Sequence, residues 1–562
     1  MIAFDLTTQS CVPVLDAAGK PQLLSLRDTL VRAHELKEIQ HGSPVITAAL
    51  VRLFVALLTD LYPLEFASQW APVWQRGAFD PNAVDAYFEK YKDRFDLFHA
   101  KYPFYQCAAL EDDNPVNLNI FNCAASAGNN PTLFAHDLDS VEGDYTPVEA
   151  FHLLLATQSF ALAGLLRRTT RLKGEAEPLY WQSAYGGVLI PGAMIWLTGD
   201  NLFETLCLNL APLTALETED DEELGETDDD LPIWRRDKPE ALRDRQGKHG
   251  IAKITPRGTR DRLTFQSRLI RLLPEQSQGQ DEGEIVVRRA AFNHGRSLDA
   301  QAQHNFDPML AYRPSKKEGW LVTRLSAEKA LWRDCHAFMG LSDRPGGKLE
   351  RVTPRALKLL HTHLQNVPGL EPHRILRLNV AGLANDQAKI LLWRHDRLDA
   401  PAKVLCDPEM AARVHSLLED AEGVAQSLRT ATRRLCELFI APLSVDARGK
   451  SSENGMRADP DRVTALADAV DTRPTYWARL ESGFHQLLLQ LGEDPEAAST
   501  QWKDRIQREA RCAFKEVVAS LGDSPQTFKA EALVNAYFVV PSRQTKPVPR
   551  SITKSSSKEK TA

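Results

Sequence analysis

The chain has 562 residues, of which 43% are hydrophobic and 25% charged, and its formal net charge at pH 7 is −7. This length excludes a single small core and favours two or three domains. The eight cysteines include no CxxC pair, which excludes a compact disulfide framework and favours reduced thiols in a cytoplasm.

The negative charge is concentrated in residues 217–230 (ETEDDEELGETDDD), which carry ten acidic side chains and no basic ones. Because this block supplies ten negative charges, the rest of the chain sums to +3. We predict a solvated, disordered loop here, with an interaction tether as the alternative. The summed charge neither supports nor excludes a nucleic-acid partner, so local basic patches have to decide.

Residues 1–400 mix helical patterns with short strand-like runs, which predicts one large, mixed α+β domain. No secretory signal and no membrane span are expected. The most apolar stretch, 45–58, contains Arg52 and is shorter than a bilayer span, so it is predicted as a buried core helix. The strand-like runs are residues 11–15, 263–273, 284–288 and 320–325.

Residues 401–540 are predicted to form a C-terminal four-helix bundle. Four dipeptides place a capping residue before a proline and so mark helix starts: Asp407-Pro408, Asp459-Pro460, Asp494-Pro495 and Ser524-Pro525. Residues 541–562 hold six basic residues and one acidic residue. They have nothing with which to build a core, so a disordered basic tail is expected.

Common enzyme signatures are missing from the sequence, which has no Walker-type phosphate loop, HExxH or GxSxG motif. His361 and His363 are two residues apart and would point to different faces of a helix, so no metal site is expected there. His395 and Asp396 leave a metal-dependent cytosolic hydrolase open as an alternative. A helical scaffold without a nucleic-acid role is a further alternative.

The most informative segment is 385–396 (NDQAKILLWRHD). Its local pattern predicts a polar loop that enters an amphipathic helix, with Asn385 and Asp386 acting as a cap. Gly382 permits an unusual turn that would aim the amide side chains outward.

The longer stretch 382–396 (GLANDQAKILLWRHD) resembles the segment with which the CasA family reads a protospacer-adjacent motif (PAM) in DNA. CasA is the large subunit of the type I-E CRISPR surveillance complex, called Cascade. The resemblance places Gln387, with Asn385 and Asp386 beside it, on the family's glutamine wedge, which enters the duplex and starts strand separation. An inserted side chain has to offset base unstacking, and an amide can pair with the exposed base edges.

Further segments resemble the same family in the same order, beginning with 95–106 (FDLFHAKYPFYQ). Residues 126–137 (SAGNNPTLFAHD) resemble the loop that meets the 5′ handle of the guide RNA. The matching residues there are Asn129, Asn130, Thr132 and Phe134, whose polar groups suit backbone contacts and whose aromatic ring suits base stacking. A capped turn with Phe134 in the core is the alternative.

The sequence departs from the family at two sites. The family's glycine-rich loop is reduced to Gly164, followed by basic residues suited to phosphate, namely Arg167, Arg168, Arg171 and Lys173. This change suggests that a different motif is read. The family's lysine finger has no clear counterpart, and the candidates for its DNA contact are Arg288, Arg289 and Arg296.

The resemblance implies a protein without an active site or cofactor that binds double-stranded target DNA and starts R-loop formation. Its implied partners are the CRISPR guide RNA, the backbone, small and handle-binding subunits of Cascade, and a recruited helicase-nuclease. The helical bundle would hold the displaced DNA strand or the small subunits. Four of its basic residues are candidates for the strand: Arg429, Arg433, Arg505 and Arg508.

Overall fold

The structure is a computed structural model. The structure describes residues 2–535 apart from the following internal ranges: 65–66, 123–142, 167–168, 176–177, 180–181, 191, 211–212, 214–228, 238–252, 278–282, 299–305, 318, 327, 341–350, 365–366, 387–388, 442–443, 446–450 and 453–457. It divides into two compact units. Unit 1 comprises Met1–Ser416 and Phe484–Ala498, and unit 2 comprises Leu417–Gly483 and Ser499–Ala562.

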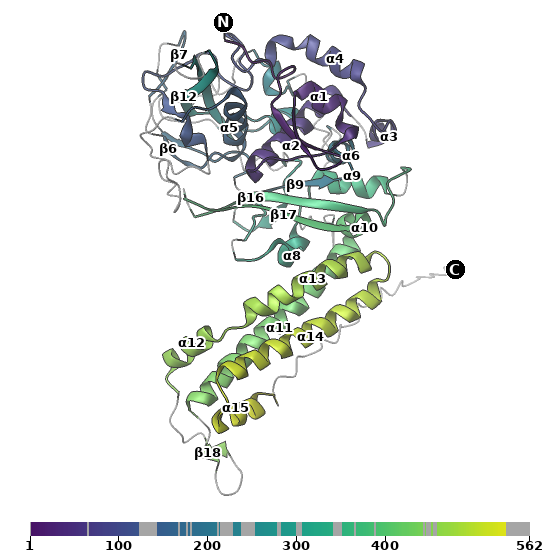
Figure 1. The fold of residues 1–562 in the computed structure, drawn as a ribbon, viewed down its shortest axis with the longest axis vertical. Coiled ribbons are helices and arrows are strands. Elements are labelled where there is room, and N and C mark those ends of the chain that lie inside the picture. Colours follow the sequence, from purple (N-terminus) through teal and green to yellow (C-terminus); the bar gives the residue numbers. More distant parts are fainter. Residues whose placement is uncertain are drawn as a thin grey trace, which may run out of the picture. The chain divides into compact units, whose positions relative to one another are not determined.

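Unit 1 is a mixture of helices and small sheets, as the sequence predicted (Figure 1). Its helices are α1 (Leu26–Val31), α2 (Pro44–Leu61), α3 (Trp70–Gln75), α4 (Pro81–Lys90), α5 (Pro147–Phe160), α6 (Leu202–Asn209), α7 (Thr259–Leu263), α8 (Leu331–Asp334), α9 (Arg355–His363) and α10 (Ala402–Cys406). Short 3-10 turns include η3 (Lys92–Arg94), η4 (Leu118–Phe121) and η5 (Ile233–Arg235).

The strands of unit 1 form small sheets, three of which have three strands: β2-β1-β3, β11-β12-β5 and β17-β16-β9. The strand bounds are β1 (Val12–Asp16), β2 (Pro21–Leu24), β3 (Leu36–Ile39), β4 (Leu110–Glu111), β5 (Val116–Asn117), β6 (Gly164–Leu166), β7 (Arg171–Leu172), β8 (Gln182–Ala184), β9 (Ala193–Thr198), β10 (Lys253–Ile254), β11 (Arg268–Gln276), β12 (Ile285–His294), β13 (Ser297–Leu298), β14 (Tyr312–Ser315), β15 (Gly319–Val322), β16 (Ile375–Asp386) and β17 (Lys389–Pro401).

Helix α2 forms the centre of the core of unit 1, as predicted for residues 45–58. Every residue from Val45 to Asp60 is buried, and the helix contacts α5, α6 and α7. Among the described residues it is the one helix whose length and composition would also suit a membrane span, but 89% of it is covered by the protein's own side chains. A helix that is apolar on all sides belongs in the interior.

Arg52 on α2 is a buried charge that is fully paired. Its guanidinium donates to both carboxylate oxygens of Asp307, at 3.0 and 2.6 Å, and to the backbone oxygens of Arg262 and Leu263, at 2.8 and 3.0 Å. The two side chains are only 2% and 0% exposed. This pairing explains how an arginine is tolerated inside an apolar helix, because a buried charge is stable only when it is paired and hydrogen-bonded.

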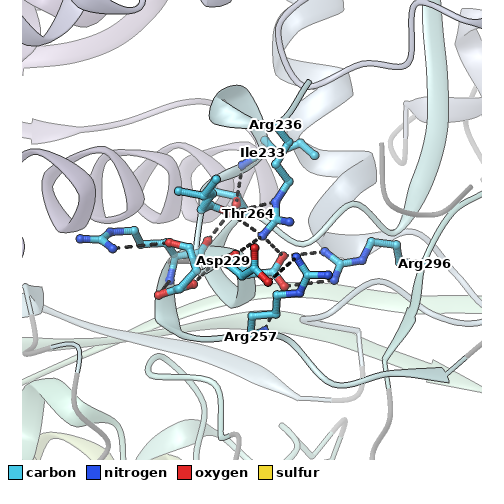
Figure 2. Close-up of polar contacts among 10 residues, drawn as sticks. Asp229, Ile233, Arg236, Arg257, Thr264 and Arg296 are labelled. Atoms are coloured by element: carbon cyan, nitrogen blue, oxygen red, sulfur yellow. Dashed lines mark hydrogen bonds and ion pairs between the residues drawn. The ribbon is translucent and has the colours of Figure 1, made fainter. Parts of the chain in front are cut away.

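A second buried pair joins Asp261 on α7 to Arg296 after β12. Two hydrogen bonds of 2.6 and 3.0 Å connect them, and the side chains of Arg236 and Arg296 converge on the Asp261 carboxylate (Figure 2). Burial raises the pKa of Asp261, but the arginines lower it further, so it lies below its ordinary value.

The C-terminal end of the acidic block is buried, whereas the sequence predicted a solvated loop as far as residue 230. Residues 214–228 lie outside the described residues, but Asp230 is only 3% exposed. Its carboxylate accepts hydrogen bonds from the backbone N–H groups of Arg260 and Asp261, at 3.2 and 2.8 Å. The predicted solvated loop therefore does not extend to Asp230, because this carboxylate satisfies the first turn of α7.

The chain from α11 onward, which includes unit 2, is mainly helical, and the predicted helix starts are confirmed. Helices α11 (Pro408–Ile440), α12 (Pro460–Ala469), α14 (Pro495–Ser520) and α15 (Pro525–Asn535) each begin at the proline of a predicted pair, and α13 (Arg473–Leu491) adds one that those pairs did not mark. A short hairpin of β18 (Ser444–Val445) and β19 (Ser451–Ser452) follows α11. Buried Trp502 and Tyr476 hydrogen-bond to backbone oxygens of α11 within this unit, at 3.0 and 3.1 Å.

We predict that Asp307→Asn lowers the stability of unit 1 at neutral pH by about 3–5 kcal/mol, the usual cost of breaking a buried ion pair. Burial raises the pKa of Asp307, but Arg52 and Arg262 lower it further, so it lies below its ordinary value. The stabilisation is therefore complete above the unfolded-state pKa of about 3.9 and disappears as the pH falls through the folded-state value. Urea unfolding, followed by tryptophan fluorescence, should show the difference between wild type and variant narrowing below about pH 4.

The matched control for this experiment is Asp85→Asn. Asp85 also pairs with an arginine, Arg27, but its side chain is 48% exposed, so its removal should cost less than about 1 kcal/mol. A pH-independent difference for Asp307→Asn, or equal losses for both variants, would contradict the assignment.

Candidate nucleic-acid interface

The segment that resembles the glutamine wedge lies on a long β-hairpin. Strands β16 and β17 pair antiparallel from Ile375 with Pro401 to Asp386 with Lys389 (Figure 1). Gln387 itself lies outside the described residues. Asn385 and Asp386 directly precede it in the sequence. Their backbone lies at the tip of the hairpin, where Asp386 pairs with Lys389.

The tip of this hairpin extends beyond the rest of its sheet. Strand β9 pairs with β16 only from Arg377 to Gly382, so within the described sheet Leu383–Asp386 pairs with β17 alone. A register shift occurs between Ala384 and Asn385, and such irregularities increase the local twist of a ribbon. A two-stranded ribbon has dimensions that fit the major groove of DNA.

The prediction of a polar loop entering a helix at residues 385–396 was wrong. Asn385 and Asp386 end one strand, and Lys389–Pro401 is a strand along its whole length. The apolar run after Lys389 suits either structure locally, and pairing with β16 decides between them. Gly382 also lies within a strand and not in a turn. A Cβ there would be 2.9 Å from the backbone oxygen of Gly192, so this glycine permits close approach to β9.

Polar side chains anchor the base of the hairpin. Arg377 and Asp399 form a two-bond ion pair across the strands, at 2.7 and 3.2 Å. Buried Asn379 donates to Thr198 on β9 at 2.8 Å and contacts the Nε2 atom of His395 at 3.0 Å. Sequence reasoning missed Asn379, and an asparagine inside an otherwise apolar strand is the signal that could have revealed it.

The His395 side chain packs against its neighbours in the fold. Its ring lies 4.9 Å from that of Trp196, and burial, followed by the charge of Arg397, lowers its pKa to about 4. The ring is therefore neutral at physiological pH. Asp396 forms an ion pair with Arg394, whose guanidinium also donates to the backbone oxygen of Lys329 at 2.8 Å.

This geometry does not favour the metal-dependent hydrolase. His395 and Asp396 are consecutive on a strand, where neighbouring side chains point to opposite faces. Within the described ranges, no group of three or more His, Cys, Asp or Glu side chains is placed to hold a metal ion.

The predicted guide-RNA residues Asn129, Asn130, Thr132 and Phe134 lie outside the described residues. The two sides of that segment are held together, because the Tyr145 hydroxyl donates to Asn119 at 2.9 Å. Of the lysine-finger candidates, Arg288 donates to the carboxylate of Asp144, which follows that segment in the chain, at 2.5 and 3.2 Å. Arg289 lies on β12 opposite Asn117 of β5.

Gly164 begins strand β6, which pairs with β8, and it is exposed. A Cβ at this position would meet no atom within 4 Å, so the described fold does not itself require glycine there. Arg167 and Arg168 lie outside the described residues, whereas Arg171 and Lys173 are exposed at β7 and just after it.

Arg296 is buried, whereas a DNA contact requires an exposed side chain. Its side chain is 1% exposed, is paired with Asp261, and lies over the ring of Phe265 at 4.4 Å. In the described conformation this guanidinium cannot reach a phosphate or a base. The prediction that Arg296 contacts DNA is corrected to a structural role, because its charge is already neutralised in the interior.

The four basic candidates in unit 2 differ in accessibility. Arg429 and Arg433 are exposed one turn apart on α11, on the same side of the helix. Arg508 is 62% exposed on α14. Arg505 is half-buried and donates to Ser482 at 3.2 Å, and a Cβ on the neighbouring Gly483 would lie 2.3 Å from its Nε atom. The first three are therefore better placed to meet a phosphate backbone.

Comparisons with known proteins agree with the resemblance seen in the sequence. The model of the family "CRISPR-associated protein Cse1" matches residues 5–513. The CRISPR-associated protein CasA/Cse1 of Thermus thermophilus is 30% identical over 533 residues, which is 94% of this chain and 95% of that protein.

Solved structures share the same fold. The crystal structure of Thermus thermophilus CasA has a TM-score of 0.72 and 27% identity, covering 95% of this chain and 98% of that one. A chain of a "CRISPR RNA-guided surveillance complex" has a TM-score of 0.71 and 23% identity, covering 96% and 99%. Since the family match and the curated relative both span nearly the whole chain, this protein belongs to the CRISPR-associated Cse1 (CasA) family.

Proposed function

We propose that this protein is the large subunit of a type I-E CRISPR RNA-guided surveillance complex, where it recognises a PAM in double-stranded DNA and starts R-loop formation. Membership of the Cse1 family supports this role. A structural relative at 23% identity is a chain of such a complex, which supports a fold suited to assembly. The guide RNA would read sequence by base pairing, while this subunit reads the short motif.

The proposal is carried by the position of Asn385 and Asp386, which directly precede Gln387 in the sequence, at the paired end of the β16–β17 hairpin. The base of the hairpin is fixed by β9, by the Arg377–Asp399 pair and by Asn379. The tip carries polar residues beyond the last pairing with β9. A ribbon held rigidly at one end can press a side chain between base pairs without bending away, and an amide there can bond to base edges.

The remaining contacts are proposed from the family resemblance. Asn129, Asn130, Thr132 and Phe134 would meet the 5′ handle of the guide RNA, and exposed Gly164 would face the motif. Arg429, Arg433 and Arg508 would hold the displaced strand through its phosphates. The subunit would have no active site of its own and would recruit a separate helicase-nuclease. A cytoplasmic location is proposed because the described cysteines are free thiols.

The test of the wedge is the substitution Gln387→Ala in the reconstituted guide-RNA complex. Unstacking a base step costs a few kcal/mol, so we expect binding to a duplex with the preferred motif to weaken by about tenfold to a hundredfold. A randomised-motif duplex library, read by sequencing of the bound fraction, measures this loss.

Two controls make the result specific. A target with a pre-opened bubble needs no wedge, so the variant should bind it like the wild type. Gln40→Ala, at an exposed glutamine that precedes α2, should bind both targets normally. Equal binding of every duplex by wild type and Gln387→Ala would show that the tip has only a structural role.

The contribution of unit 2 is tested with the double variant Arg429→Gln and Arg433→Gln. Each phosphate contact adds about 0.7 to the salt slope of single-strand binding, so losing two contacts should reduce the slope for an opened target by about 1.4. Titrations of the complex at several salt concentrations measure the slope. The control is Arg434→Gln, because Arg434 already pairs with Glu437 at 2.7 Å. An unchanged slope in the double variant would contradict strand binding by this face.

A further inference from the structure

A polar pocket of about 210 Å³ lies in unit 1, and none of its lining residues belongs to the β16–β17 hairpin. Three segments that are distant in sequence build it: Arg94 to Ala109, Leu172 to Glu175, and Ile233 to Asp237. The first of these includes the PFYQ stretch of residues 103–106, to which no role has yet been given.

Backbone pairing holds the walls of this pocket in place. The N–H of Lys173 donates to the oxygen of Ala109 at 2.8 Å, beside the β4–β7 pair. Gln106 is fixed by its side chain, which donates to Leu97 and accepts from the N–H of Leu272, both at 2.7 Å. The pocket is therefore part of the rigid fold.

Tyr105 in the wall has an unusual backbone conformation. Its φ is +59°, and among the described residues it is the one non-glycine residue with a positive φ. A residue with a side chain rarely adopts this region, and such strain persists where the surrounding structure enforces it, commonly at binding sites.

The lining of the pocket carries more positive than negative side chains: Arg94, Lys101, Lys173 and Arg236 against Glu175 and Asp237. Lys101 and Lys173 are exposed on opposite segments. Arg94 is 19% exposed, donates to the backbone oxygen of Arg236 at 3.1 Å, and forms a 2.6 Å ion pair with Asp237. Asp237 is 75% exposed, so its carboxylate lies where an anionic group from solution would meet the guanidinium.

Aromatic rings form the other part of the lining. The Arg94 guanidinium lies 3.6 Å from the centre of the Tyr102 ring, which is parallel to the ring of His99 at 5.8 Å. Phe104 and Trp234 are stacked at 6.1 Å but are buried, whereas the Tyr102 ring is half-buried and so offers aromatic surface to the pocket. A cation and aromatic surfaces therefore lie together in one concave site.

We propose that this pocket binds one unpaired nucleotide of a single-stranded nucleic acid, with its phosphate on Arg94, Lys101 and Lys173 and its base beside the half-buried ring of Tyr102. The phosphate would take the position of the Asp237 carboxylate. Arginine suits phosphate because its planar fork matches the oxygens. Aromatic rings accept any base through stacking. A base within a duplex is not accessible to such a pocket, whereas an unpaired one is.

This proposal is independent of the wedge, because it uses different residues and no paired DNA. The probes are adenosine 3′,5′-bisphosphate and its deoxy form, which represent RNA and DNA, with adenosine and inorganic phosphate as fragments. Calorimetric titration of the full chain at low salt measures their binding. Both bisphosphates binding, or one of them alone, supports the pocket and identifies the kind of strand.

Variants at exposed positions test the residues without threatening the fold. Lys101→Gln and Lys173→Gln should each weaken bisphosphate binding by about threefold to tenfold. Asp237→Asn should strengthen it by a similar factor, because the competing carboxylate is removed. The matched control is Lys20→Gln, at an exposed lysine outside the pocket.

Four outcomes would overturn the proposal. These are no measurable bisphosphate binding, adenosine binding as tightly as the bisphosphates, inorganic phosphate binding as tightly as the bisphosphates, and Asp237→Asn weakening the interaction. The gain expected for Asp237→Asn keeps the test informative, since a damaged fold would not bind more tightly.

Discussion

The interior of unit 1 depends on buried arginine–carboxylate pairs. Arg52 on α2 reaches Asp307, 255 residues later in the chain, and also the carbonyls at the end of α7. Asp60 on the same helix accepts a hydrogen bond from Tyr87 at 2.7 Å and pairs with Arg235 at the same distance. A buried charge without its partner is strongly destabilising. These pairs therefore stabilise the observed arrangement of α2, α7 and the segments around them.

These buried pairs also fix the positions of nearby surface residues. The chain from Asp229 to Asp237 is held by the contacts of Asp230, Arg235 and Arg236 with the interior. Figure 2 shows Arg236 among these contacts. Asp237 and Trp234 therefore have defined positions in the polar pocket. The hairpin shows the same principle, because its base is anchored by β9 and by polar pairs, whereas its tip, Leu383–Asp386, pairs with β17 alone within the described sheet.

Much of the functional reasoning could start from sequence because the informative residues were contiguous. The stretch around Gln387 and further segments in the same order carried the family resemblance, and the family match supports it. Its conformation could not be predicted in the same way. Residues 389–401 suit a helix or a strand locally, and the strand forms because β16 pairs with them along their length. The sequence made Arg296 a candidate DNA contact, but in the structure this arginine is buried and paired with Asp261.

The sequence by itself determined the features that depend on near neighbours. The proline-marked starts of α11, α12, α14 and α15 and the burial of α2 follow from local caps and from apolar composition. Only the tertiary structure decided the burial of Asp230, the pairing of Arg296 and the assembly of a pocket from three separate segments. The physical reason is that a charge or a strand acquires its role from its partner, and those partners lie tens to hundreds of residues away.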